Sequence, residues 1–362
     1  MLLRIALFSI LAVSLFGQTP SVARADTPAV PATSVKTPET APPQAPKPGE
    51  PIHVEVNEVI VPVTVTDDKG RFVSDLEQKD FRIFDEGREQ RIEYFSRERS
   101  QPVVVGFLID MSNASRMHWK DYKDAAIELV DTLITGDKKY SGYLLSFASD
   151  AEILVNTTHD PEVIAEKMRK LKPGGGAALY DAVWKACTSH DLVKGEPIEP
   201  RRVLIIVGDG HDTASRHTLA QAVEIAQRNL VTIYCISTVS FGAVTDDEQN
   251  LVQLAKQTGG RVESPLQKVY QDVSGYISTP MDEGNYVYEP GTGGYAMDLS
   301  NGMYRAIEHI AGEVTTQYIL RYVPDVPHTG KEGTKEFRNI RVDVDLPNVT
   351  VRARRGYYPF NL

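Results

Sequence analysis

Cysteine is scarce in this chain: among its 362 residues only Cys187 and Cys235 are cysteines. Two cysteines are too few for a disulfide framework. The residues around them place Cys187 in a helix and Cys235 in a buried strand. We expect both to be separately buried as small hydrophobic side chains, and a single disulfide, which export would permit, is the alternative.

An excess of positive charge is also missing. The chain has 39 Lys and Arg residues against 49 Asp and Glu residues, which gives a formal net charge of −10 at pH 7. Nucleic-acid binding draws most of its affinity from cationic side chains on phosphates. We therefore expect no nucleic-acid partner.

Long apolar runs are missing outside the first residues. The run from Ile5 to Phe16 is about a dozen residues long, whereas a membrane-spanning helix needs about 20. It follows Arg4 and precedes the small residues of Ala23-Arg24-Ala25, which is the pattern of a secretory signal peptide. We expect residues 1–25 to be cleaved, leaving an exported protein, periplasmic or extracellular, without a membrane span. An uncleaved anchor helix is the alternative.

Two catalytic motifs are missing as well. No Gly-x-Ser-x-Gly nucleophile elbow occurs, and the glycine run 174–176 lacks the Gly-Lys-Ser or Gly-Lys-Thr end of a phosphate-binding loop. The glycine run is better explained as a flexible turn before a helix. These absences favour a protein that is not an enzyme.

What the chain does contain divides into segments. Residues 26–51 are rich in Pro, Ala, Thr and Lys and predict a disordered linker. Residues 52–100 alternate with a period of two and predict an N-terminal β segment, with a continuous alternating run from Gln90 to Phe95. Residues 317–362 predict a C-terminal β segment. We expect the two β segments to pair into one flanking β-sandwich-like domain.

Residues 102–316 alternate strands and helices. The unbroken apolar runs Val103 to Ile109 and Val203 to Val207 are typical of strands buried on both faces. The alternation predicts an α/β domain with a doubly wound, mostly parallel sheet. A Gly-, Tyr- and Pro-rich insertion is expected at about 264–300, followed by a helix near Met303 to Val314.

Two carboxylates follow the buried strands. Asp110 ends the first, Asp209 follows the second, and Ser112 lies two residues beyond Asp110. Ligands of doubly wound sheets bind beyond the carboxyl ends of the strands. A hydroxyl and two carboxylates there suit Mg²⁺, Ca²⁺ or Mn²⁺. The alternative is that both Asp side chains only accept hydrogen bonds from nearby backbone amides.

At these residues the chain resembles the von Willebrand factor type A domain, and in particular exported bacterial proteins in which a β segment precedes such a domain. The resemblance covers nearly everything from Val54 to Tyr358. It rests on Asp110-Met111-Ser112, Gly174 to Ala182 (GGGAALYDA) and Asp209-Gly210. The closing stretches Tyr318 to Tyr322 (YILRY) and Arg352 to Tyr358 (RARRGYY) fit the same group of exported proteins.

The resemblance implies a metal-ion-dependent adhesion site built from an Asp-x-Ser-x-Ser run, a Thr and an Asp. Asp110, Ser112 and Asp209 match this pattern, but Ala114 and Ala177 replace the second Ser and the Thr. Ser115 stands one residue too late to replace Ala114 without a local rearrangement. The implied site is therefore partly degenerate, and its candidate ions are Mg²⁺ and Ca²⁺.

The resemblance implies a non-catalytic protein-binding or adhesion module whose unidentified partner docks on the top face of the α/β domain. Two alternatives stay open. One is a hydrolase, which needs His211 within hydrogen-bond distance of the Ser112 hydroxyl. The other is a metal-free structural protein of the cell envelope.

Overall fold

The structure is a computed structural model that describes residues 58–97, 102–117, 119–193, 200–239, 246–265, 293–325 and 337–359. The expected signal peptide, the expected linker and most of the expected insertion lie outside these ranges. No helix among the described residues is long and apolar enough to cross a membrane.

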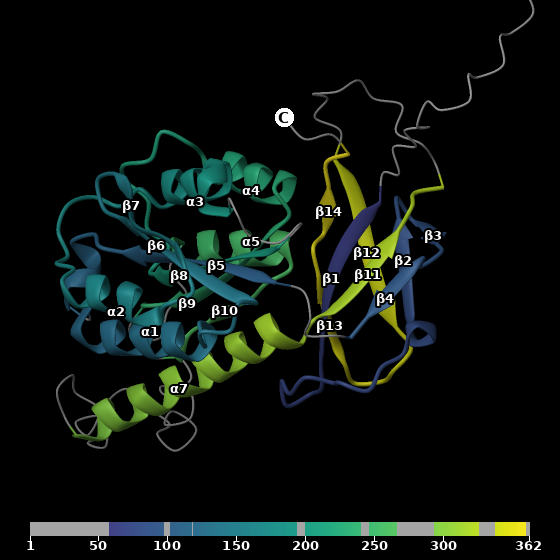
Figure 1. Cartoon of the computed structure of the whole chain (residues 1–362), viewed down its shortest axis with the longest axis horizontal. Helices are drawn as coiled ribbons and strands as arrows, with labels where there is room; N and C mark the ends of the chain where they lie inside the picture. Colours follow the sequence, from purple (N-terminus) through teal and green to yellow (C-terminus); the bar gives the residue numbers. More distant parts are fainter. Residues whose placement is uncertain are drawn as a thin grey trace, which may run out of the picture. The chain divides into compact units, whose positions relative to one another are not determined.

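The central element is a six-stranded sheet with the order β10-β9-β8-β5-β6-β7 (Figure 1). All neighbouring pairs are parallel except β6 and β7, which are antiparallel. This confirms the predicted mostly parallel α/β architecture. The strands are β5 (Val103–Asp110), β6 (Tyr140–Phe147), β7 (Ala151–Thr158), β8 (Arg201–Gly208), β9 (Val231–Ser237) and β10 (Val262–Glu263).

Helices cover both faces of this sheet (Figure 1). Alternate residues of β5 point to opposite faces, so Val105 and Phe107 enter one core while Val104 and Leu108 enter the other. This explains why β5 is apolar throughout. One face packs on α1 (Trp119–Leu133), α2 (Pro161–Arg169) and α7 (Gly293–Thr316), and the other on α3 (Leu179–Thr188), α4 (Leu219–Arg228) and α5 (Glu248–Thr258).

Local sequence signals fix several helix ends. The Asp160 side chain accepts a hydrogen bond from the Glu162 amide, and Pro161 occupies the first turn of α2. Thr218 and Gln221 form a reciprocal capping box at the start of α4. The α5 helix ends at Gly259, whose φ of 90° lies in the left-handed region that favours glycine.

The β segments from the two ends of the chain pair with each other. Strand β1 lies antiparallel between β11 and β13, and β2 pairs with β12. The sheets are β13-β1-β11-β4 and β14-β12-β2-β3, and one apolar core joins them. The predicted sandwich-like domain is therefore present. Its strands are β1 (Val59–Thr66), β2 (Phe81–Asp85), β3 (Arg88–Gln90), β4 (Tyr94–Ser96), β11 (Tyr318–Tyr322), β12 (Arg338–Val344), β13 (Thr350–Ala353) and β14 (Gly356–Tyr357).

A buried carboxylate links these strands. Asp85, at the end of β2, is fully buried and accepts hydrogen bonds from Arg338 Nε at 2.9 Å, Tyr322 OH at 2.9 Å and Tyr357 OH at 3.0 Å. These donors come from β12, β11 and β14. One N-terminal residue thus holds three C-terminal strands.

Two sequence predictions differ from the structure. The run from Gln90 to Phe95 is not one strand: β3 ends at Gln90 and pairs with β2, whereas β4 begins at Tyr94 and pairs with β11 in the other sheet. The last helix begins at Gly293 rather than near Met303. Alternation alone gave no sign that the chain changes sheets between β3 and β4.

The two cysteines are separately buried, as expected, and do not form a disulfide. Cys187 lies in α3 and Cys235 in β9, and both are buried and free. Both contribute to the core on the α3, α4 and α5 face of the sheet. They act as small apolar side chains.

Candidate metal centre

Strands β5 and β8 end side by side, and this brings the two predicted carboxylates to one edge of the sheet. The parallel register pairs Ile109 with Val207, so Asp110 lies opposite Gly208 and Asp209 follows immediately. A Cβ atom on Gly208 would lie 2.9 Å from Asp110 Cβ and 3.2 Å from its Oδ2. Gly208 therefore leaves the space that the Asp110 side chain occupies. The sequence analysis did not single out Gly208.

The Asp110 side chain is almost completely buried, with 2% of its surface exposed. Its Oδ1 accepts a hydrogen bond from the Ser112 amide at 2.7 Å, whereas Oδ2 has no partner among the described residues. Burial raises the pKa of Asp110 to about 6, and the nearby Asp209 charge adds to this effect, although the Ser112 amide opposes it. The carboxylate form thus lies in surroundings that disfavour an uncompensated negative charge.

Two hydroxyls share this pocket with Asp110. Ser112 is 3% exposed and Ser115 is 9% exposed, and within the described part of the chain neither hydroxyl has a hydrogen-bond partner. Both nevertheless act on the Asp110 carboxyl and lower its pKa. Residues Ala114–Met117 form a 3₁₀ helix, so the backbone at Ser115 is turned rather than extended. The sequence analysis set Ser115 aside because a tight turn at this point was not foreseen.

Asp209 is half-buried and less confined. Its Oδ1 accepts a hydrogen bond from the His211 amide at 2.9 Å. The next residue, Gly210, has a φ of 87°, and a Cβ atom there would lie 2.3 Å from the Asp247 carbonyl oxygen. The alternative role of Asp110 and Asp209, accepting bonds from amides two residues further along, is thus realised for one oxygen of each.

The loop before α3 closes the site from a second side. The Gly174 amide donates to the Met111 carbonyl at 2.7 Å, and the Asn113 amide donates to the Gly175 carbonyl at 3.1 Å. Ala177 donates its amide to Thr213 Oγ1 at 3.0 Å. These bonds join the loops that follow β5, α2 and β8, but the buried Ala177 side chain supplies no oxygen.

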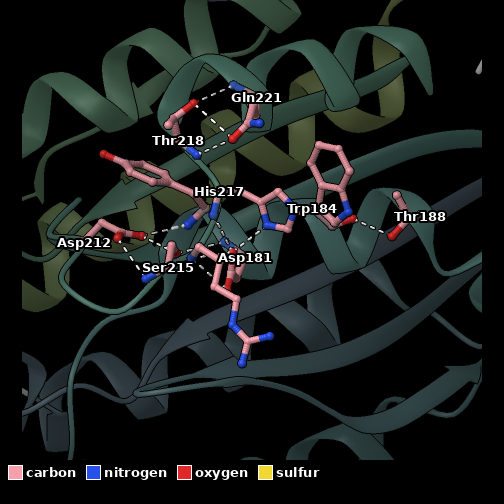
Figure 2. A network of polar contacts seen from close by, with 10 residues as sticks. Asp181, Trp184, Thr188, Asp212, Ser215, His217, Thr218 and Gln221 are labelled. Carbon is pink, nitrogen blue, oxygen red and sulfur yellow. Dashed lines mark hydrogen bonds and ion pairs between the residues drawn. The ribbon is translucent and has the colours of Figure 1, made fainter.

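Figure 2 shows the polar network that holds the loop after β8 on the start of α3. The Asp181 carboxylate accepts hydrogen bonds from the Arg216 amide at 3.1 Å and from the His217 ring at 2.6 Å. Ser215 Oγ donates to Asp212 at 2.6 Å and accepts from the Asp181 amide at 3.0 Å. These bonds attach the later part of the loop to the start of α3.

The same network accounts for the electrostatics of Asp181. Burial acts to raise the pKa of this carboxyl, but the hydrogen bonds from the His217 and Arg216 amides and from the His217 ring hold it below its ordinary value. The His217 ring also stacks on Trp184 of α3, with 4.0 Å between ring centroids. None of these residues was a predicted site residue, because nothing in the sequence indicates that Asp181 and His217 meet.

His211 does not take the role that a hydrolase requires. Its Nδ1 lies 3.0 Å from Asp247 Oδ2, and this contact raises the pKa of His211. The Ser112 hydroxyl has no hydrogen-bond partner among the described residues. The arrangement thus lacks the contact between Ser112 and His211 on which that alternative depends.

The residues at this edge fit a hard divalent cation. No group of three or more His, Cys, Asp and Glu side chains suited to a metal occurs in the described ranges, so a softer, nitrogen- or sulfur-rich site is not found there. Asp110 Oδ2 and the Ser112 hydroxyl are buried oxygen atoms without partners, and Asp209 lies beside them. Carboxylate and hydroxyl oxygens are ligands of Mg²⁺, Mn²⁺ and Ca²⁺.

The family comparison agrees with this geometry. Residues 105–270 match the model of the von Willebrand factor type A domain. This part of the chain is a von Willebrand factor type A (VWA) domain. Proteins with such domains are typically interaction modules. No curated protein matches the chain.

Several solved structures resemble this chain. BatB from Bacteroides thetaiotaomicron is 18% identical, with a TM-score of 0.37, and the match covers 49% of this chain and all of BatB. A von Willebrand factor type A protein from Catenulispora acidiphila is 14% identical, with a TM-score of 0.41, over 69% of this chain and 64% of that one. Proximal thread matrix protein 1 from the mussel byssus, with zinc in its MIDAS motif, is 17% identical, with a TM-score of 0.37, over 51% and 48%. The family assignment rests on the match of residues 105–270.

Proposed function

We propose that this protein is a non-catalytic binding module that holds a divalent cation between Asp110, Ser112 and Asp209. The cation completes its coordination with an acidic group of a protein partner that docks on the loops beyond the carboxyl ends of β5 and β8. The observation that carries the proposal is the pair of buried oxygens without partners, Asp110 Oδ2 and Ser112 Oγ.

The physical argument concerns charge. A buried carboxylate needs a counter-charge, and no described cationic side chain forms an ion pair with Asp110. A divalent ion supplies that charge and gives both unpaired oxygens a partner. Because the shell lacks the oxygen that a Thr at position 177 would add, more of the ion's coordination is left to water and to the partner.

The location of this function follows from the N-terminal sequence. An apolar run followed by small residues, with cleavage expected after Ala25, supports export to the periplasm or the cell exterior. Adhesion or assembly at the cell envelope is the function that fits such a location. The partly degenerate metal site then serves partner capture rather than chemistry.

The test is calorimetric titration of Mg²⁺, Mn²⁺ and Ca²⁺ into chelator-treated protein, with Asp110→Ala as the comparison. We expect saturable binding in the wild-type protein and none in the variant. A titration of a short Asp- and Glu-rich peptide follows, with and without the ion that binds most tightly, and peptide binding should require that ion.

Absence of metal binding in both proteins would contradict the metal-dependent proposal. If the peptide nevertheless bound without the ion, a metal-free interaction domain would replace it. Indifference to metals and peptide together would favour the metal-free structural role.

A further inference from the structure

We infer that Ser115 supplies the second hydroxyl of the metal site, from one position later in the chain than the family pattern places it. The inference rests on the proposed function, because it concerns the ion on which that function depends. The family run has its two serines two positions apart, whereas in this chain Ser112 and Ser115 are three positions apart.

The backbone explains why a spacing of three can replace a spacing of two. In an extended chain, side chains two positions apart lie on the same side. A 3₁₀ turn has three residues per turn, so this alternation does not hold within it. Residues Ala114–Met117 form such a helix, and the Arg116 amide donates to the Asn113 carbonyl at 3.3 Å. Ser112 lies just before this turn, and the turn brings the Ser115 hydroxyl, like that of Ser112, beside the Asp110 carboxyl.

The exposure of the side chains in this turn agrees with an inward-facing Ser115. Asn113, Ala114 and Arg116 are all exposed, whereas Ser115 is 9% exposed. A serine at position 114 would point to solvent in this backbone. Ser115 is thus the inward-facing residue of the turn.

The Ser115 hydroxyl is also not used in the hydrogen bonding of the described loop residues. Together with the Ser112 hydroxyl and Asp110 Oδ2, it is a buried oxygen for which the described residues offer no hydrogen-bond partner. Buried polar atoms in folded proteins are nearly always paired, so three unpaired oxygens around one carboxyl point to a missing partner. The hydroxyls can donate to the Asp110 carboxyl but bring no positive charge, whereas a divalent cation would bind all three oxygens and supply the counter-charge.

The resulting shell defines the ion class. Asp110, Asp209, Ser112 and Ser115 offer two carboxylates and two hydroxyls on short side chains, all buried except that of Asp209. Mg²⁺ and Mn²⁺ accept six oxygens in octahedral geometry and retain several waters, which matches four protein ligands and two further positions. Two positions for water or an acidic partner are one more than a site with a Thr ligand would leave.

The experiment is a calorimetric titration of Mn²⁺ into the chelator-treated protein and its variants. We expect Ser115→Ala to weaken binding about tenfold or more, Ser115→Thr to retain it, and Asn113→Ala, an exposed change in the same turn, to alter it by less than about twofold. The double variant Ala114→Ser with Ser115→Ala restores the family spacing but should not restore affinity.

A second measurement does not depend on affinity. Water-proton relaxation by bound Mn²⁺ reports how many waters the ion holds, and Ser115→Ala should add one. Urea unfolding of the metal-free proteins provides the control, because a hydroxyl without partners can be removed without loss of stability. A clear loss of stability in metal-free Ser115→Ala would indicate a structural hydroxyl and overturn the inference.

The outcomes separate this inference from the proposed function. Wild-type binding that survives Ser115→Ala, with an unchanged water count, overturns the role of Ser115 and leaves the metal site in place. Affinity restored by the double variant would show that residue 114 reaches the ion, which also overturns it. No Mn²⁺ binding by the wild-type protein overturns both.

Discussion

Replacing the Asp110 carboxylate by its neutral isostere should stabilise the metal-free protein. Burial is the main reason that the pKa of Asp110 is about 6 rather than 3.8. A difference of about two pH units corresponds to about 3 kcal/mol of the free energy of unfolding. In Asp110→Asn, the new amide side chain would keep an oxygen that accepts the Ser112 amide, and its NH₂ group could donate to the Ser112 or Ser115 hydroxyl.

The pH dependence gives the sign of the effect. Because the folded pKa is raised, stability from this group is fully present below about pH 4 and is lost as the pH rises through about 6. Asp110→Asn removes that loss. We therefore expect the variant to exceed the wild type by up to about 3 kcal/mol at pH 7.5 in chelator and to match it near pH 4.

Urea unfolding followed by tryptophan fluorescence measures this difference. Both tryptophans of the chain, Trp119 and Trp184, lie in helices of the α/β domain and report on its unfolding. Saturating Mg²⁺ should reverse the order, because only the wild type binds the ion and gains stability from it. The reasoning fails if Asp110→Asn is less stable in chelator at pH 7.5, or if the difference does not change with pH.

Three further changes test other parts of the structure. Gly208→Ala should weaken Mg²⁺ binding in calorimetry and cost about 1–3 kcal/mol in urea unfolding, since its Cβ would meet the Asp110 side chain; unchanged binding would contradict the close approach. Asp181→Asn should lower stability by about 1–3 kcal/mol at pH 7, because it weakens the bonds from Arg216 and His217. The pKa of Asp181 is lowered, so its contribution disappears in acid, and a loss that persists there would argue against this origin. Asp85→Ala should cost about 3–5 kcal/mol and expose the sandwich strands to limited proteolysis, and wild-type resistance would refute the linking role.

Much of the fold could be predicted because the burial of a strand in the structure also determines the pattern of apolar residues in its sequence. The unbroken apolar runs of β5 and β8 reflect burial on both faces, and the strand-end position of Asp110 follows directly from β5. The change of sheet between Gln90 and Tyr94 could not be predicted, because each half of the run alternates as a strand should.

The missing details of the site have a similar explanation. Gly208 matters only through its register opposite Asp110, which is set by pairing between strands far apart in the chain. The inferred role of Ser115 depends on the 3₁₀ turn at Ala114–Met117, which the serine spacing in the sequence does not reveal. Sequence spacing alone does not indicate that the backbone turns at this loop.

The pairing of β1 also governs the order in which the protein can fold. Val63 of β1 pairs with Tyr318 on one side and with Ala353 on the other. Strand β1 therefore remains unpaired until almost the whole chain has been synthesised. Contacts this distant in sequence slow folding, and unpaired strand edges invite association with other chains. The α/β domain, whose strands all come from the middle of the chain, can complete its own sheet before the sandwich closes. The sandwich therefore closes last. A chain truncated before β13 leaves one edge of β1 unpaired, and proteases and chaperones can recognise such an edge.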